Sequence, residues 1–147
     1  MEILNNIDWY INSSLKTVIN KYTWKNLLEK EWDTVIFDNS THENVVIIFP
    51  LHDNYTFTEK RELPRPVTVK QFLTFIYDFY KEPLKPENIE NAFSGMEEWL
   101  EDVLEHYDGD VTKLTNYDVF TDTCRPVLSG LYLDIETREY TVLIGPD

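Results

Sequence analysis

Carboxylates crowd one short segment of the chain, between Pro86 and Asp110. The segment contains no Lys and no Arg, and its nine acids are Glu87, Glu90, Glu97, Glu98, Glu101, Asp102, Glu105, Asp108 and Asp110. Acidic groups at this density can bind a divalent metal, imitate the phosphates of a nucleic acid, or attract a basic protein surface. The net charge of the protein is −14 and −9 of it falls here, so the rest of the chain is nearly neutral.

Apolar residues in the same segment predict the helix that positions five of these acids. They recur at i, i+3, i+4, i+7, i+8 and i+11, and they are Met96, Trp99, Leu100, Val103, Leu104 and Tyr107. The opposite face of a helix over 96–107 then carries Glu97, Glu98, Glu101, Asp102 and Glu105. Like charges one turn apart repel by about 0.2–0.5 kcal/mol per pair, whereas each buried apolar side chain stabilises by about 1.5–3 kcal/mol. The helix can therefore form, although stability alone does not select its outer face.

Several interpretations of this face are compatible with the sequence. It can be a solvated surface that keeps the protein soluble. The leading functional hypothesis is a small non-enzymatic protein that acts through protein–protein contact and docks a basic partner on the five acids. An alternative is an inhibitor that imitates phosphates and occupies a nucleic-acid-binding protein. A third possibility, from another class, is a small metal-dependent hydrolase, for which Asp53, Asp108 and Asp110 would have to converge.

The remaining reactive residue types predict no catalytic residue, no metal site and no cofactor. The four glycines stand alone, so no phosphate-binding loop is present, and the three histidines lack metal-ligand spacing. His52 is expected to be a loop histidine hydrogen-bonded to its neighbour, and Cys124 a buried structural thiol. The run Asp108-Gly109-Asp110 predicts a turn at a helix end, because the alternating acids of a calcium loop are missing.

Composition indicates one domain in a reducing compartment. A chain of 147 residues that is 42% hydrophobic can bury one core, so residues 1–147 are expected to form a single domain. The N-terminus has no basic start or long apolar stretch, and there is one cysteine, which together predict an intracellular protein. No apolar run approaches the ~20 residues of a membrane helix. The negative charge disfavours direct binding to nucleic acid or to anionic membranes and leaves a basic protein as the expected partner.

In the first half of the chain, the hydrophobic pattern predicts helices followed by strands. Residues 3–22 show helical spacing, and Thr23 is expected to cap a short second helix. Residues 34–37 and 44–49 are β-branched and aromatic runs that predict a hairpin, with a third strand around Tyr55 and Phe57.

In the second half, Thr68 is expected to cap an apolar central helix that ends at Pro83. Pro86 begins the next helical segment, and residues 131–135 and 139–145 predict a C-terminal β-hairpin. The predicted fold class is α+β, with a mainly antiparallel sheet, N-terminal and central helices and this hairpin.

Two stretches of the chain resemble short uncharacterised proteins of large double-stranded DNA viruses. They read RPVTVKQFLTFIYDFYKEPLKPENIENAF, from Arg65, and LSGLYLDIETREYTVLIGPD, from Leu128. The resemblance covers roughly residues 65–145 and consists of core patterns. It implies a setting inside an infected cell or in a virion, and it implies no activity.

Overall fold

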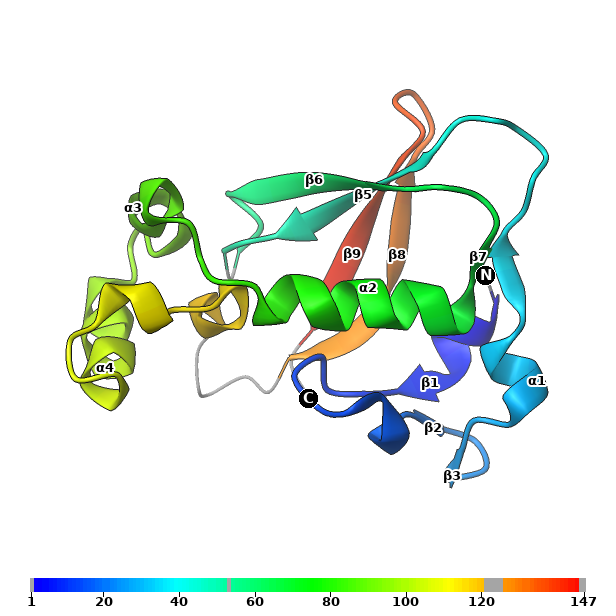
Figure 1. Ribbon diagram of the computed structural model, residues 1–147, viewed down its shortest axis with the longest axis horizontal. Helices are drawn as coiled ribbons and strands as arrows, with labels where there is room; N and C mark the ends of the chain where they lie inside the picture. Colours follow the sequence, from blue (N-terminus) through cyan, green and yellow to red (C-terminus); the bar gives the residue numbers. More distant parts are fainter. Residues whose placement is uncertain (1, 53, 121–125, 146–147) are drawn as a thin grey trace.

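The computed structural model describes residues 2–52, 54–120 and 126–145 (Figure 1). One long helix, α2, lies across a mixed β-sheet, and a small sheet built from N-terminal residues lies beside it (Figure 1). A helical arm containing α3 and α4 extends beyond the C-terminal end of α2. The architecture is an α+β single domain with mostly antiparallel pairings, as the sequence predicted.

The central sheet joins two hairpins and has the strand order β6-β5-β9-β8. Its strands are β5 (Val45–Pro50), β6 (Thr58–Leu63), β8 (Val127–Asp134) and β9 (Glu139–Gly145). The pairs β5–β6 and β8–β9 are antiparallel, which confirms the C-terminal hairpin. The two hairpins meet where β5 runs parallel to β9. Strand β5 is therefore central, which explains its unbroken apolar sequence.

The predicted hairpin of residues 34–37 and 44–49 is wrong in its pairing. Strand β4 (Val35–Phe37) pairs with β7 (Val67–Thr68) instead of with β5. The ring of Phe37 packs edge-on against Phe72 and Tyr140, at 6.0 and 4.9 Å between centroids, so β4 contacts α2 and β9 through this side chain. The strand expected around Tyr55 is β6, which begins only at Thr58.

The predicted helix over residues 3–22 is also wrong. The region is divided among short elements: η1 (Glu2–Asn6), β1 (Ile7–Asp8), η2 (Leu15–Thr17), β2 (Ile19–Asn20) and β3 (Lys25–Asn26). Apart from the exposed Tyr22, its apolar residues are at least partly buried, but polar side chains bond the local backbone and interrupt any helix. Ser14 accepts from the amide of Lys16, and Asn20 accepts from the amides of Tyr22 and Thr23.

In place of the second predicted helix the structure has a single helical turn, α1 (Glu29–Trp32). Residues 21–24 instead form a tight turn between β2 and β3, in an antiparallel sheet ordered β1-β2-β3. The predicted N-terminal helices are thus replaced by a small sheet. This sheet is tied to the central one because Leu128 donates its amide to the carbonyl of Trp9, at 3.1 Å.

Helix α2 (Val69–Lys81) is the central helix that the sequence predicted. Thr68 accepts from the amide of Gln71 while the Gln71 side chain accepts from the amide of Thr68, which completes a capping box. The buried face of α2 meets β5 through an aromatic cluster, in which Phe49 stacks on Phe79 at 4.0 Å between centroids. This packing fixes the direction of α2, and the end of α2 positions the arm.

Alkaline pH is expected to destabilise the protein through Tyr80. Its hydroxyl is buried and donates to the carbonyl of Pro50 at 2.9 Å. Burial raises the pKa of Tyr80 well above its ordinary value of 10.0, and the nearby Tyr55 adds to the shift. A raised folded-state pKa favours the protonated group, so its full contribution is present below pH 10.0 and is lost as the pH rises further. The free energy of unfolding should therefore fall above about pH 10.

Urea titrations at about pH 8, 10 and 11 measure this loss in the wild type and in Tyr80→Phe. The variant loses the donor to Pro50, which costs about 1–3 kcal/mol at neutral pH, so the slopes with pH are compared rather than the absolute values. The slope should be shallower in Tyr80→Phe. Equal slopes in the two proteins would assign the alkaline loss to other groups.

Candidate docking surface

The arm that carries α4 is anchored at both of its ends to the C-terminal end of α2. Its elements are η3 (Pro86–Asn88), α3 (Ile89–Ala92), α4 (Glu97–His106), η4 (Val111–Lys113) and η5 (Asn116–Val119). At the base, Leu84 donates its amide to the carbonyl of Leu114 at 2.9 Å. Buried Asn116 donates its side-chain amide to the carbonyl of Phe79 at 2.8 Å. The arm is therefore a closed loop fastened to a rigid helix.

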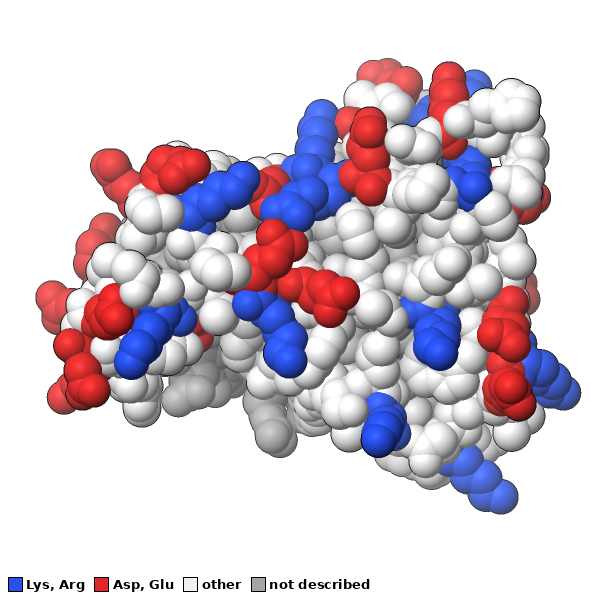
Figure 2. Space-filling model, viewed as in Figure 1, with Lys and Arg blue, Asp and Glu red and all other residues white. Residues whose placement is uncertain are grey.

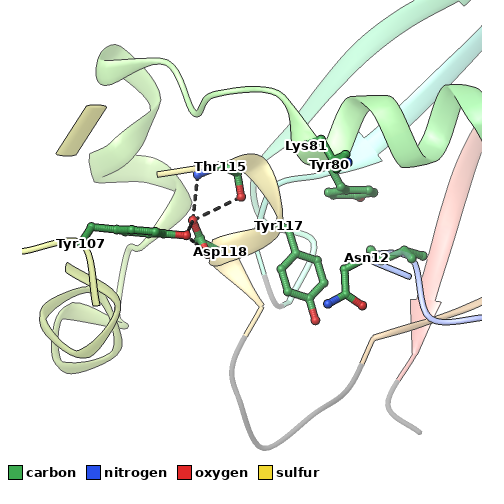
Figure 3. Close-up of a pocket in the computed structure, with 8 residues that line it drawn as sticks. Asn12, Tyr80, Lys81, Tyr107, Thr115, Tyr117 and Asp118 are labelled. Carbon is green, nitrogen blue, oxygen red and sulfur yellow. Dashed lines mark hydrogen bonds between the residues drawn. The ribbon is translucent and has the colours of Figure 1, made fainter. Parts of the chain in front are cut away.

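Helix α4 is held on its inner side by contacts with η5. The indole nitrogen of Trp99 donates to the carbonyl of Asp118 at 2.8 Å. The carboxylate of Asp118 accepts from the Tyr107 hydroxyl at 3.0 Å and from the Thr115 amide at 2.8 Å (Figure 3). Partial burial, with Asp118 adding to it, raises the pKa of Tyr107 above its ordinary value of 10.0, so its proton stays in this hydrogen bond at neutral pH.

The outer face of α4 places all five predicted docking residues in solvent. Glu97, Glu98, Glu101, Asp102 and Glu105 are exposed, and acidic side chains line the outer edge of the molecule at this end (Figure 2). Glu97 also accepts from the amide of Gly95, at 3.3 Å. Among the described residues, none of the five has a Lys, Arg or His within ion-pairing distance. The predicted helix and its exposed acidic face are confirmed, and their role stays a prediction.

The acids that follow α4 form a turn, as predicted from Asp108-Gly109-Asp110. Asp108 and Gly109 have positive φ angles of 55° and 79°, and Gly109 donates its amide to the carbonyl of Leu104 at 2.8 Å. Asp110 accepts from the amide and hydroxyl of Thr112, and these bonds lower the pKa of its carboxyl. Within the described ranges, no three His, Cys, Asp or Glu side chains gather as metal ligands.

Two residues considered in the sequence analysis lie outside the described residues. They are Asp53, named for a possible hydrolase site, and Cys124, expected to be a buried thiol. His52, which precedes Asp53 in the sequence, is 4% exposed and accepts at Nδ1 from the amide of Asn54, at 3.1 Å, as expected of a hydrogen-bonded loop histidine. Because Nδ1 accepts, Nε2 carries the proton and donates to the carbonyl of Ser94 at 2.7 Å. This hydrogen bond of His52 thus links the end of β5 to the arm.

A pocket of about 250 Å³ lies where the arm meets α2 and the N-terminal segment (Figure 3). Its polar lining includes Asn12, Lys81, Tyr117 and Asp118. The Lys81 ammonium lies 4.5 Å from the centre of the Tyr77 ring, and the Asp118 carboxylate is already bonded to Thr115 and Tyr107. Both charged groups among the described lining residues are therefore engaged in contacts within the protein.

Sequence reasoning missed a second surface, the turn formed by Lys21, Tyr22, Thr23, Trp24 and Lys25, which we call the basic turn. Its aromatic rings are open to solvent, with Tyr22 74% and Trp24 73% exposed. Because helices were predicted in this region, the exposure of both rings was not predicted. The available signal was charge, since residues 9–28 form the longest stretch without an acid and carry three Lys.

The chain matches no protein-family model, no curated protein and no solved structure. In the part of the chain that the structure describes, no helix has the length and apolar character needed to cross a bilayer. Functional inference therefore depends on the geometry and charge of these two surfaces.

Proposed function

We propose that this protein is a non-enzymatic binding protein whose α4 face docks a basic protein surface. The observation that carries the proposal is the concentration of five exposed acids on one anchored helix, in a segment that contains no Lys and no Arg. Glu59 and Glu82 both bind Arg61, at 2.7 and 3.0 Å, and Glu139 binds Lys60 at 2.8 Å. The five acids of α4 lack such partners within the described residues, although the helix that presents them is firmly anchored.

The electrostatics of α4 favour a partner that brings positive charge. Acids one turn apart repel, and those near its C-terminal end also face the negative end of the helix dipole. A basic surface relieves both effects on binding, so part of the binding free energy comes from strain present in the free protein. The fastenings of Trp99, Tyr107 and His52 hold the face in place, which reduces the entropy lost on association.

The proposed setting is the interior of a virus-infected cell or a virion. The resemblance of residues 65–145 to short proteins of large double-stranded DNA viruses supports it. The single cysteine fits a reducing compartment.

The same face also supports imitation of nucleic-acid phosphates. Glu97, Glu101 and Glu105 lie at successive one-turn intervals on an exposed side of α4. Their Cβ atoms are about 5–6 Å apart, in a regular row of negative charge. In this alternative, the basic partner is the phosphate-binding groove of a nucleic-acid-binding protein. Competition between that protein's oligonucleotide and this chain would distinguish it from ordinary docking.

Neutralising the face is expected to weaken binding strongly without harming the fold. The change is Glu98→Gln, Glu101→Gln and Glu105→Gln, which keeps shape and helix propensity. The melting temperature should hold or rise because like-charge pairs are removed. Affinity for a basic protein captured from the native cell should fall by at least about tenfold, and wild-type binding should weaken as salt shortens the Debye length from ~10 to ~3 Å.

A matched control removes three exposed acids away from α4: Glu43→Gln, Glu62→Gln and Glu136→Gln. This variant has the same net charge as the first, so it separates a local face from overall charge. It should bind as the wild type does. Equal binding by the two triple variants, or binding that persists at high salt, would reduce the α4 face to a solvated surface.

A further inference from the structure

Hydrogen bonds fix the backbone of the basic turn in a conformation that leaves its aromatic side chains in solvent. The Asn20 carbonyl accepts from the amide of Trp24 at 2.8 Å, while the Asn20 side chain accepts from the amides of Tyr22 and Thr23. Trp24 has a φ angle of 59°, in the left-handed region that favours glycine. A turn selected for stability alone would carry Gly or Asn at this position. A large aromatic residue that is 73% exposed in such a conformation indicates a contact surface.

The charge around the basic turn is opposite to that of the protein as a whole. Lys16, Lys21 and Lys25 are exposed and lie in the acid-free stretch 9–28, whereas Lys30 follows it and lies between Glu29 and Glu31. The turn stands between two open hollows of about 480 and 410 Å³. Lys21 and Trp24 line the first together with Asp8, and Lys25, Leu28 and Lys30 line the second together with Glu31. A ridge of aromatic rings and ammonium groups beside hollows with both polar and apolar lining fits an acidic segment that also offers apolar side chains.

The same chain contains such a segment in α4. We propose that the basic turn of one copy binds the α4 face of a second copy. This inference rests on the proposed function, because it names the partner of the acidic face. The acids of α4 from residue 97 to residue 105 extend over about 12 Å, and the half-buried Met96 and Leu100 border them. The base-free segment and the acid-free segment are thus complementary in charge.

The positions of the two surfaces require the contact to be between molecules. Helix α4 lies at one end of the long axis, and the turn between β2 and β3 lies towards the other end (Figure 1). A single copy cannot bring them together, whereas successive copies can join head to tail as chains or rings. Two molecules of charge −14 repel each other at long range, but the Debye length of ~8 Å at 0.15 M salt confines this repulsion. The small contact area predicts weak association.

Two neutralised variants test the contact by complementation. The turn variant is Lys21→Gln and Lys25→Gln, and the helix variant is the Glu98, Glu101 and Glu105 to Gln triple. Sedimentation velocity at 0.15 M salt, from about 10 µM to about 1 mM protein, measures the assembly. The wild type should form species larger than a dimer, and each variant alone should stay monomeric. Their mixture should form a 1:1 dimer, because it retains only one intact pair of surfaces.

Two further variants separate the surface from the net charge and from folding. Lys113→Gln with Arg138→Gln removes two exposed cations elsewhere and should assemble as the wild type does. Trp24→Gly keeps every Lys and suits the positive φ, so it should fold normally and lose at least about tenfold in association. Folding is checked for each variant by its melting temperature.

The sedimentation results decide whether the basic turn binds the α4 face of a second copy. A wild type that stays monomeric to about 1 mM, or a mixture of the two variants that stays monomeric, overturns the inference. A monomeric wild type whose basic turn binds a thymidine oligonucleotide would assign the turn to single-stranded nucleic acid instead. If self-association fails while the α4 triple still loses a captured basic protein, the proposed function stands and only the identity of the partner is wrong.

Discussion

Replacing Phe49 by Ala is expected to lower the free energy of unfolding by about 3–5 kcal/mol. Phe49 is fully buried near the C-terminal end of β5. Its ring stacks on Phe79 at 4.0 Å and lies 5.6 Å from Phe75 and 5.9 Å from Tyr80, measured between centroids. All three partners belong to α2, so truncation leaves a cavity at the main contact between the helix and the sheet.

Urea denaturation followed by circular dichroism measures the loss. Because 3–5 kcal/mol is a large part of the stability of an ordinary domain, Phe49→Leu provides a milder variant that should lose less than about 1.5 kcal/mol. Leu133→Ala is the control in the same sheet, since Leu133 is 41% exposed and should lose about 1 kcal/mol or less. A Phe49→Ala loss no larger than that of Leu133→Ala would show that the aromatic cluster does not hold α2 in place.

Elements with strong local signals could be predicted from the sequence. Helix α2 has a capping box at Thr68 and Gln71, and α4 has an apolar stripe ended by Gly109. The C-terminal hairpin has two alternating strands around a short turn. In each case the residues that specify the element lie within one or two turns of it in the chain, so no distant partner has to be known.

Strand partners and the N-terminal sheet could not be predicted because their causes are distant or competing. The parallel pair of β5 and β9 joins Ile47 to Tyr140, far along the chain, and no periodicity encodes that choice. In the N-terminal region, Ile7, Ile11 and Val18 are buried at a spacing that also fits a helix. Local bonds from Ser14 and Asn20 decide against the helix.

The acidic face of α4 and the basic turn also differ in how far each can be predicted from the sequence. The acidic face of α4 follows directly from helical periodicity, because apolar and acidic positions separate onto opposite sides. The basic turn depends on Asn20 folding the chain back on itself, which places Tyr22 and Trp24 in solvent. Aromatic residues in a sequence are normally assigned to the core, so exposure of this kind is found only from the structure.

Replacing Asp118 by Ala is expected to release α4 from the domain and to destabilise the protein by about 2–4 kcal/mol. The Asp118 carboxylate accepts from the amide and hydroxyl of Thr115, at 2.8 and 3.2 Å, and thereby caps η5. It also accepts from the Tyr107 hydroxyl, at 3.0 Å, at the end of α4. Truncation leaves these partly buried donors without an acceptor. Hydrogen exchange of α4 amides should therefore quicken more than exchange in α2.

Two control variants separate the loss of the cap from the loss of the link to α4. Asp110→Ala removes a similar cap, made by a carboxylate whose hydrogen bonds go to Thr112 within its own turn, so it should leave exchange in α4 unchanged. Tyr107→Phe removes only the link and should cost about 1 kcal/mol. If Asp118→Ala and Asp110→Ala have the same effect on α4, the Tyr107 bond does not anchor the helix. If the anchoring holds, Asp118→Ala should also weaken docking on the acidic face, although it changes no residue of that face.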